Sequence, residues 1–332
     1  MPLDRHARRF LEMLAAAGQA TGRYSDVAER RDALTNLADM VDPPGETAIG
    51  GVRDHLMQVA DGQIVLRTYS PLGEPARVLP GILFFHGGGW VAGSLDTHDG
   101  FCRRLSNETG CRVIAVDYRL APEHPFPYGL ADAVAALKYV TANPKLFGVD
   151  VARLGVAGDS AGGTLAAVLC RIARDAGGPA ISFQLLLCPI LDVHGESAAR
   201  RELAQGYFLD SETLARDLEL YAGANDLSDI RLSPLRAEEY AGLPPAYIHT
   251  AQFDPFADEG ETYAHRLGGF GVPVHGRAHP GMIHYFYCMP RMVPYAQTAM
   301  KIIGAEIRHA VQLPQLVERR IQRRIRPELI RA

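Results

Sequence analysis

The stretch that decides the fold is Arg153-Leu154-Gly155-Val156-Ala157-Gly158-Asp159-Ser160-Ala161-Gly162-Gly163. An apolar, strand-like run (153–157) ends at this Gly-x-Ser-x-Gly turn, and a helix-like run (164–173) begins directly after it. Small residues let the backbone turn sharply and raise a serine hydroxyl above the strand, while a helix start points N–H groups at a developing oxyanion. A glycine-rich loop with an idle serine is the alternative. With these flanks, the pattern favours Ser160 as a nucleophile.

Strand-like and helix-like runs alternate on both sides of this turn. Two runs, 55–60 and 63–69, flank Asp61-Gly62, which predicts a β-hairpin at the start of a sheet. The later strands are expected at residues 81–85, 112–116, 153–157, 181–188, 246–250 and 273–277. Short, branched apolar strands separated by helices are typical of a mainly parallel sheet with helices on both faces. The sequence therefore predicts an α/β fold.

Two segments interrupt this alternation and suggest how the chain is divided. Residues 1–45 have apolar residues at helical spacing up to Pro43-Pro44, and residues 190–240 contain a helix-like run after Ser211 and a turn-rich stretch. We expect the second segment to be an insertion over the carboxyl-terminal edge of the sheet. The predicted parts are N-terminal helices (1–45), a core in two pieces (46–189 and 241–313), the insertion (190–240) and a basic tail (314–332). The tail is expected to be a solvated appendage, and the alternative is a basic amphipathic helix that binds a partner or an acidic surface.

Composition sets limits on function. The chain has 332 residues, of which 47% are hydrophobic and 22% charged, enough for one large core. A net charge of −4 without a basic stripe before the tail argues against nucleic-acid binding and favours a small neutral or apolar substrate. The five cysteines include no C-x-x-C pair, which predicts free buried thiols rather than disulfides or a zinc site. No cofactor is expected.

The N-terminal residues do not have the pattern of an export signal. Glu12 interrupts the apolar stretch that follows Phe10, so a signal-peptide core is not predicted. No uninterrupted apolar run approaches the length of a membrane-spanning helix. The expected setting is a reducing, cytoplasmic one.

A second glycine-rich motif, His86-Gly87-Gly88-Gly89-Trp90, follows the strand-like run 81–85. Its glycines free the backbone to aim N–H donors at a substrate oxygen, as in the second half of an oxyanion hole. A phosphate-binding loop would need a following Lys-Ser/Thr pair or dinucleotide glycine spacing, and neither is present. His86 is predicted to brace the loop rather than to act as the base.

The base and its orienting acid remain open at this stage. In this kind of arrangement the chain order is Ser, then Asp or Glu, then His. Asp192 and Asp254 each follow a predicted strand, and His279 and His284 both lie beyond the last one. Spacing alone does not decide between the members of either pair.

From the hairpin to the final helix, the chain resembles the bacterial hormone-sensitive-lipase-like esterases. The matching motifs are His86-Gly87-Gly88-Gly89-Trp90, Asp117-Tyr118-Arg119-Leu120-Ala121-Pro122-Glu123-His124-Pro125-Phe126-Pro127, Gly158-Asp159-Ser160-Ala161-Gly162-Gly163, Phe253-Asp254-Pro255-Phe256-Ala257-Asp258-Glu259-Gly260 and Gly281-Met282-Ile283-His284-Tyr285-Phe286. The chain departs from the family pattern at Phe256, Ala257 and Tyr285, which bears on substrate fit rather than on the chemistry.

The resemblance implies an α/β-hydrolase fold with a helical cap, built from the N-terminus and an insertion. It implies Asp254 as the acid and His284 as the base. The oxyanion donors it implies are Gly88, Gly89 and the N–H of Ala161. A serine carboxylesterase that forms an acyl-enzyme on Ser160 is therefore expected, with a small-molecule ester as its partner; a homo-oligomer is compatible with the sequence.

Two rival functions use the same fold. An amidase or deacetylase would employ the same triad, and a non-catalytic ligand-binding protein resembles family members that lost the histidine. The presence of His284 argues against the second. The segments assigned to the cap are rich in charged residues, which suits a closed pocket and therefore short- to medium-chain acyl groups.

Overall fold

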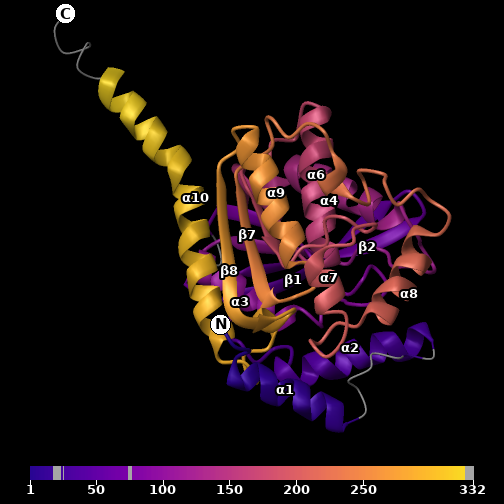
Figure 1. Ribbon diagram of the computed structural model, residues 1–332. Helices are drawn as coiled ribbons and strands as arrows, with labels where there is room; N and C mark the ends of the chain where they lie inside the picture. The colour runs from indigo at the N-terminus through magenta and orange to yellow at the C-terminus, as the bar shows by residue number, and fades with distance from the viewer. Residues whose placement is uncertain (18–23, 25, 74–76, 326–332) are drawn as a thin grey trace, which may run out of the picture.

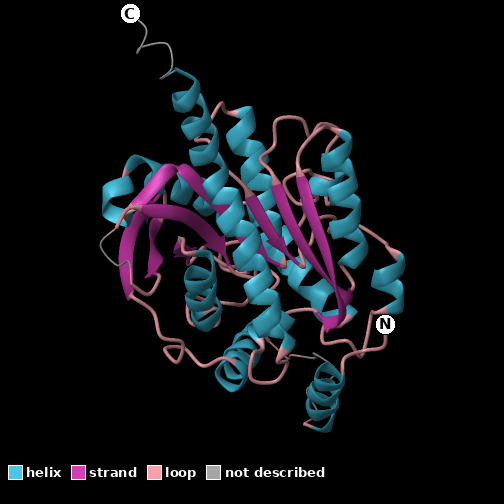
Figure 2. Ribbon diagram, turned by 90° about the vertical axis from the view of Figure 1, so that its left-hand side faces the viewer, coloured by secondary structure: helices cyan, strands magenta, loops and turns pink. Residues whose placement is uncertain are grey.

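The computed structural model describes residues 1–17, 24, 26–73 and 77–325, and of residues 313–325 it describes the backbone alone. One sheet of eight strands has the order β1-β2-β4-β3-β5-β6-β7-β8. Strands β1 and β2 form a hairpin, β2 is antiparallel to β4, and every other neighbouring pair is parallel. Helices cover both faces of this twisted sheet (Figures 1 and 2).

The bounds of the elements are as follows. The strands are β1 Gly51–Val59, β2 Gly62–Ser70, β3 Leu79–Phe85, β4 Arg112–Val116, β5 Val149–Asp159, β6 Gln184–Leu187, β7 Ala246–Phe253 and β8 Val274–Ile283. The helices are α1 Arg5–Ala16, α2 Val27–Val41, α3 Asp99–Thr109, α4 Tyr128–Ala142, α5 Pro144–Phe147, α6 Ala161–Asp175, α7 Ala198–Glu202, α8 Ser211–Ala222, α9 Ala257–Gly269 and α10 Tyr295–Ile325. Two 3₁₀ turns lie at Pro234–Arg236 and Phe286–Cys288.

The hydrophobic core has two layers, one on each face of the sheet. Successive side chains of a strand point to opposite faces. In β3, Leu83 and Phe85 therefore belong to the layer that contains residues of α4, α6 and α9, whereas Ile82 and Phe84 belong to the layer that contains residues of α3 and α10. Because β3 is buried on both faces, its sequence is a continuous apolar run, as expected for a central parallel strand.

The predicted α/β-hydrolase fold is confirmed, and most strands lie where the sequence indicated. The last strand differs, because β8 continues to Ile283 and contains His279, which we had placed beyond it. The pairing of β7 with β8 shifts between Ala251 and Phe253, and the strand contains Pro280 and Gly281. These residues interrupt the local pattern that marks a strand in the sequence.

The two segments assigned to the cap meet at one end of the molecule. Helices α1, α2, α7 and α8 gather beyond the arrowheads of β7 and β8 (Figure 1). The rings of Phe10 and Phe208 are 6.2 Å apart, and the Arg30 guanidinium lies 3.2 Å from the Asp217 carboxylate. Segments distant in the sequence therefore contact each other at the carboxyl ends of the strands.

The last helix of the structure extends into the segment that was predicted to be a tail. Helix α10 runs without a break from Tyr295 to Ile325, so the predicted tail (314–332) begins inside a helix, and its residues 326–332 lie outside the described part. The helix packs beside α3 and β8 and then projects from the body (Figure 1). Among the described residues, no helix is both long and apolar enough to cross a membrane.

A buried pair of histidines joins β7, β8 and α10. His249 Nδ1 lies 3.0 Å from His279 Nε2, and His279 Nδ1 lies 3.2 Å from the Tyr295 hydroxyl. His249 Nε2 is 3.1 Å from a carboxylate oxygen of Glu306. Burial, reinforced by the neighbouring His249 and Arg277, lowers the pKa of His279 from 6.5 to about 3. His279 is therefore neutral at physiological pH.

This low pKa of His279 predicts a loss of stability in acid. Between about pH 6.5 and pH 3 the unfolded chain binds a proton at His279 that the folded chain does not. The free energy of unfolding should therefore fall with decreasing pH, by up to about 1.4 kcal/mol per pH unit from this site. Urea denaturation between pH 7 and pH 4.5 should show a shallower pH dependence in His279→Gln. The exposed His309→Gln serves as control, and equal slopes in all three proteins would contradict the prediction.

Candidate active site

Ser160 occupies the sharp turn between β5 and α6. Its φ of 51° and ψ of −120° lie outside the regions that L-residues favour, and its N–H donates to Leu187 O at 2.9 Å. A Cβ at Gly158 would overlap the Gly162 carbonyl, and one at Gly162 would overlap the Phe85 carbonyl. Only glycine at both places lets the turn pack this closely, which explains the small residues of the motif.

Asp254 and His284 follow neighbouring parallel strands, β7 and β8. The Cα register pairs Phe253 with Ile283, so the next residue of each strand emerges at the same edge of the sheet. His284 Nδ1 lies 2.8 Å from Asp254 Oδ2, and Asp254 Oδ1 accepts from the N–H of Phe256 at 2.9 Å. Both side chains are buried. Since Nδ1 faces the carboxylate, Nε2 is the nitrogen left for a proton transfer.

Ser160 emerges at this same edge, after β5. Within the described residues no hydrogen bond joins the Ser160 hydroxyl to His284, whereas the histidine and the aspartate are directly bonded. Bonds between a nucleophile and its base are often long without substrate and tighten when it binds. The structure thus brings the predicted acid and base together and sets the predicted nucleophile on the same edge.

The alternative acid and base have other partners. Asp192 Oδ1 accepts from Arg236 Nε at 2.8 Å and from the N–H of His194 at 3.1 Å. His279 is held in the buried pair with His249. Of the candidates that spacing left open, the structure therefore pairs Asp254 with His284.

The glycine loop after β3 is braced by buried polar groups. Gly87 N–H donates to Asp159 Oδ1 at 2.8 Å, and Asp159 Oδ2 lies 3.3 Å from His98 Nε2. The ring of His86 stacks on Tyr118 with centroids 4.4 Å apart, and the Tyr118 hydroxyl donates to His86 O at 2.7 Å. Burial lowers the pKa of His86 to about 4. His86 is thus neutral and packed within the loop's support, as expected of a bracing residue.

Three backbone N–H groups around Ser160 are left for an incoming oxygen. In the described part of the chain, the N–H groups of Gly88, Gly89 and Ala161 donate to no protein acceptor. Gly88 and Gly89 have φ values of 120° and 66°, and Ala161 begins helix α6. These are the donors that the sequence predicted for an oxyanion hole.

Cys188 was not recognised from the sequence as part of this site. It follows β6 directly, is buried, and has a φ of 44°. Donor atoms of Cys188, Asp254 and His284 all lie within 4.8 Å of one another. Burial, together with the charge of Asp254, raises the pKa of the thiol well above its usual value. Its place after a strand that borders β5 is the sequence signal that could have indicated it.

Among the described residues, these three side chains form the only cluster whose donor atoms are close enough together to bind a metal ion. A metal would need a thiolate and a carboxylate oxygen free to bind it. Burial raises the pKa of the Cys188 thiol, which stays protonated, and the two oxygens of Asp254 already bond His284 Nδ1 and the Phe256 N–H. The arrangement therefore fits an acid–base pair with a neighbouring thiol better than a metal centre.

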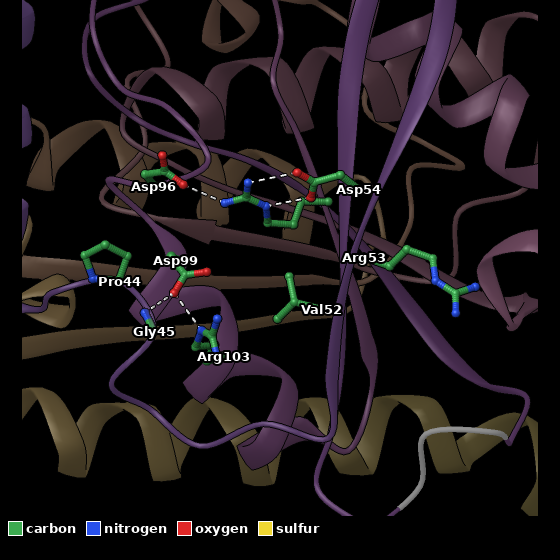
Figure 3. Close-up of a pocket in the computed structure, with 9 residues that line it drawn as sticks. Pro44, Gly45, Val52, Arg53, Asp54, Asp96, Asp99 and Arg103 are labelled. Atoms are coloured by element: carbon green, nitrogen blue, oxygen red, sulfur yellow. Dashed lines mark hydrogen bonds and ion pairs between the residues drawn. The ribbon is translucent and has the colours of Figure 1, made fainter.

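A separate hollow of about 540 Å³ lies between the β1–β2 hairpin and α3 and is lined mainly by charged residues (Figure 3). Arg67 bonds both Asp54 and Asp96, and Asp99 bonds Arg103 and the N–H of Gly45. Because its charges pair with one another and no candidate catalytic residue lines it, this hollow is not the active site.

A family model for the alpha/beta hydrolase fold matches residues 82–288. Among curated proteins, the chain is 43% identical to Esterase LipI of Mycobacterium tuberculosis over 241 residues, which cover 72% of this chain and 75% of the relative. It is 34% identical to the Arylesterase of Saccharolobus solfataricus over 296 residues, which cover 88% and 94%. The stretch 82–288 matched by the family model includes both glycine motifs and the acid–base pair.

Solved structures show the same similarity. The ester hydrolase EH1AB1 from the metagenome of Lake Arreo has a TM-score of 0.87 and 40% identity, covering 92% of this chain and 98% of that one. The hyperthermophilic esterase of the archaeon Pyrobaculum calidifontis has a TM-score of 0.87 and 37% identity, covering 94% and 100%. The chain belongs to the α/β-hydrolase family. Within that family it is one of the hormone-sensitive-lipase-like esterases, as its motifs predicted.

Asp159 anchors the glycine loop through the N–H of Gly87. Asp159→Ala would leave the Gly87 N–H and the His98 Nε2 without their buried partner, so the free energy of unfolding should fall by about 1–3 kcal/mol. Turnover of p-nitrophenyl butyrate should fall as well, because the loop loses its anchor. Asp159→Asn keeps an oxygen that can accept from the Gly87 N–H, so its free energy of unfolding and its turnover should fall less. Unchanged urea denaturation and turnover in Asp159→Ala would contradict this role.

Proposed function

We propose that this chain hydrolyses short- to medium-chain carboxylic esters through an acyl-enzyme on Ser160. The observation that carries the proposal is the buried bond between His284 Nδ1 and Asp254 Oδ2, on the same edge of the sheet as the nucleophile elbow. The general class, carboxylic ester hydrolase, agrees with the relatives, which are esterases and carboxylesterases by name.

In the first step, the Ser160 hydroxyl attacks the ester carbonyl while Nε2 of His284 takes its proton. Asp254 holds the imidazole in the tautomer whose Nε2 accepts and stabilises the imidazolium that forms. The imidazolium then returns the proton to the leaving alcohol as the acyl-enzyme forms. In the second step His284 activates water, which releases the acid and restores Ser160.

The negative charge of each tetrahedral intermediate develops on the former carbonyl oxygen. The N–H groups of Gly88, Gly89 and Ala161 have no protein acceptor among the described residues and can donate to it. One such donor is commonly worth about 3 kcal/mol of transition-state stabilisation. These steps require neither a metal nor an organic cofactor.

We infer a small preferred substrate from the charged residues of the cap. The cap helices α2 and α8 carry charged residues such as Arg30 and Asp217. A lipase that works at an oil interface would present a broad apolar lid instead. A charged cap of this kind suits a closed pocket that accepts a short acyl or alcohol group.

An amidase or deacetylase with the same triad differs only in how the leaving group fits. Turnover of p-nitrophenyl esters compared with matched anilides distinguishes the two, with faster ester turnover expected. The cytoplasmic setting and the absence of nucleic-acid binding stay predictions of the sequence.

The nucleophile is tested by Ser160→Ala. The substitution should lower kcat by several orders of magnitude and leave the circular-dichroism spectrum and Tm nearly unchanged, because the hydroxyl makes no hydrogen bond to another described residue. Ser211→Ala, at an exposed serine of α8, is the matched control and should keep wild-type kcat. Esterase activity that survives in Ser160→Ala would overturn the proposed mechanism.

The size of the acyl pocket is tested by chain length. Each buried CH₂ contributes up to ~0.8 kcal/mol until the pocket wall is reached. We expect kcat/KM to rise from acetyl to about butyryl or hexanoyl and then to fall steeply, without interfacial activation. The measurement uses p-nitrophenyl esters from acetyl to palmitoyl, each below its solubility limit. A maximum at the long-chain end would indicate a lipase.

A further inference from the structure

The glycine loop that presents two of the candidate oxyanion donors has a backbone conformation that residues other than glycine rarely adopt. Gly88, Gly89 and Trp90 follow one another with φ values of 120°, 66° and 61°. A left-handed conformation is unfavourable for a non-glycine residue such as Trp90. A run of this kind persists only where surrounding groups hold it, and strain of this type is concentrated at functional sites. The contacts of this loop therefore show what keeps the donors in position.

One face of α8 covers the loop. Asp217 and Tyr221 are four residues apart and so lie on the same side of the helix. The Asp217 side chain lies directly against Gly89, where a Cβ would overlap its carboxylate. The ring of Tyr221 stacks on Trp90, with centroids 4.6 Å apart and planes at 4°. Asp217, Trp90 and Tyr221 are all buried, so the contact is closed to water.

Helix α2 holds the loop from the other half of the cap. Arg31 Nε donates to Val91 O at 2.9 Å, and Arg31 Nη2 donates to Ala121 O at 3.0 Å. The N–H of Ala121 in turn donates to Trp90 O at 2.9 Å. On the same helix, Arg30 Nη2 lies 3.2 Å from Asp217 Oδ2 and ties α2 to α8. The two helices lie side by side in Figure 1.

We propose that the cap does more than enclose the substrate, and that Asp217, Tyr221 and Arg31 are positioning residues for the oxyanion hole. They touch neither the serine nor the substrate carbonyl. They fix the carbonyls and the α-carbon of the glycine loop, and through them the direction of the Gly88 and Gly89 N–H groups. This inference rests on the proposed function, since it assigns those N–H groups to the oxyanion.

The inference has a kinetic signature. An oxyanion donor acts mainly in the transition state, so a misdirected N–H lowers kcat and leaves KM nearly constant. Every ester develops the same oxyanion, so the loss should be the same factor for each acyl length. A residue that merely shapes the substrate pocket would change KM, and by an amount that depends on the acyl group.

The test compares Asp217→Ala with Asp217→Asn. The alanine removes both the contact with Gly89 and the bond to Arg30, whereas asparagine keeps the volume and an oxygen for Arg30. We expect Asp217→Ala to lower kcat by roughly 10- to 100-fold, by the same factor for p-nitrophenyl acetate, butyrate and hexanoate, with KM changed less than about threefold. Asp217→Asn should recover part of the loss. Glu219→Ala, at an exposed acid of the same helix, should match the wild type.

If Asp217→Ala does not fold, Arg31→Ala tests the same inference. Arg31 is partly exposed and holds the loop from α2, so Arg31→Ala should show the same loss of kcat, and Arg31→Lys a smaller one. Circular dichroism and Tm identify folded variants. Effects on KM alone, effects that vary with acyl length, or wild-type kcat in both alanine variants would overturn the inference. Activity that survives Ser160→Ala would instead overturn the proposed function, so the two failures are distinguishable.

Discussion

The turn at Ser160 is the constraint on which the rest of the site depends. Its backbone lies in a region that L-residues avoid, and it is held there by the bond from its N–H to Leu187 O and by glycine contacts too close for any side chain. The turn can exist only between β3 and β6, because those strands supply the Phe85 carbonyl and the Leu187 carbonyl. The central parallel sheet is therefore the support of the strained residue as well as the core of the fold.

The other candidate catalytic groups follow from the same sheet. Parallel strands all end at one edge, so residues placed directly after β3, β5, β7 and β8 converge there although long stretches of chain separate them. The glycine loop follows β3, Ser160 follows β5, Asp254 follows β7 and His284 follows β8. The chemistry is thus distributed along the sequence and concentrated in space.

What the sequence could predict depended on how local each feature is. The hairpin and the elbow were predictable, since a turn motif and its two flanks lie within a few consecutive residues. The choice of Asp254 and His284 over Asp192 and His279 needed the family resemblance, because strand pairing is not local. The contact of Arg30 with Asp217 spans 187 residues and leaves no pattern in either segment. Cys188 follows a predicted strand, but its contact with the acid–base pair depends on the order of the strands in the sheet.

The insertion that carries α8 also supports the base, by a separate route. Arg200 of α7 bonds Glu259 Oε1 at 2.7 Å, and the other carboxylate oxygen of Glu259 accepts from the N–H groups of Leu191 and Asp192, where the insertion begins. The Arg200 guanidinium lies over the ring of Phe256, 4.9 Å from its centroid. That ring packs edge-on against His284 at 5.6 Å. At Phe256, one of the positions where the chain departs from the pattern of the family it resembles, a flat aromatic surface thus lies between a cap arginine and the candidate base. The cap therefore contacts residues that support the oxyanion loop and residues that support His284. A change in the position of the cap would alter both the oxyanion donors and the base.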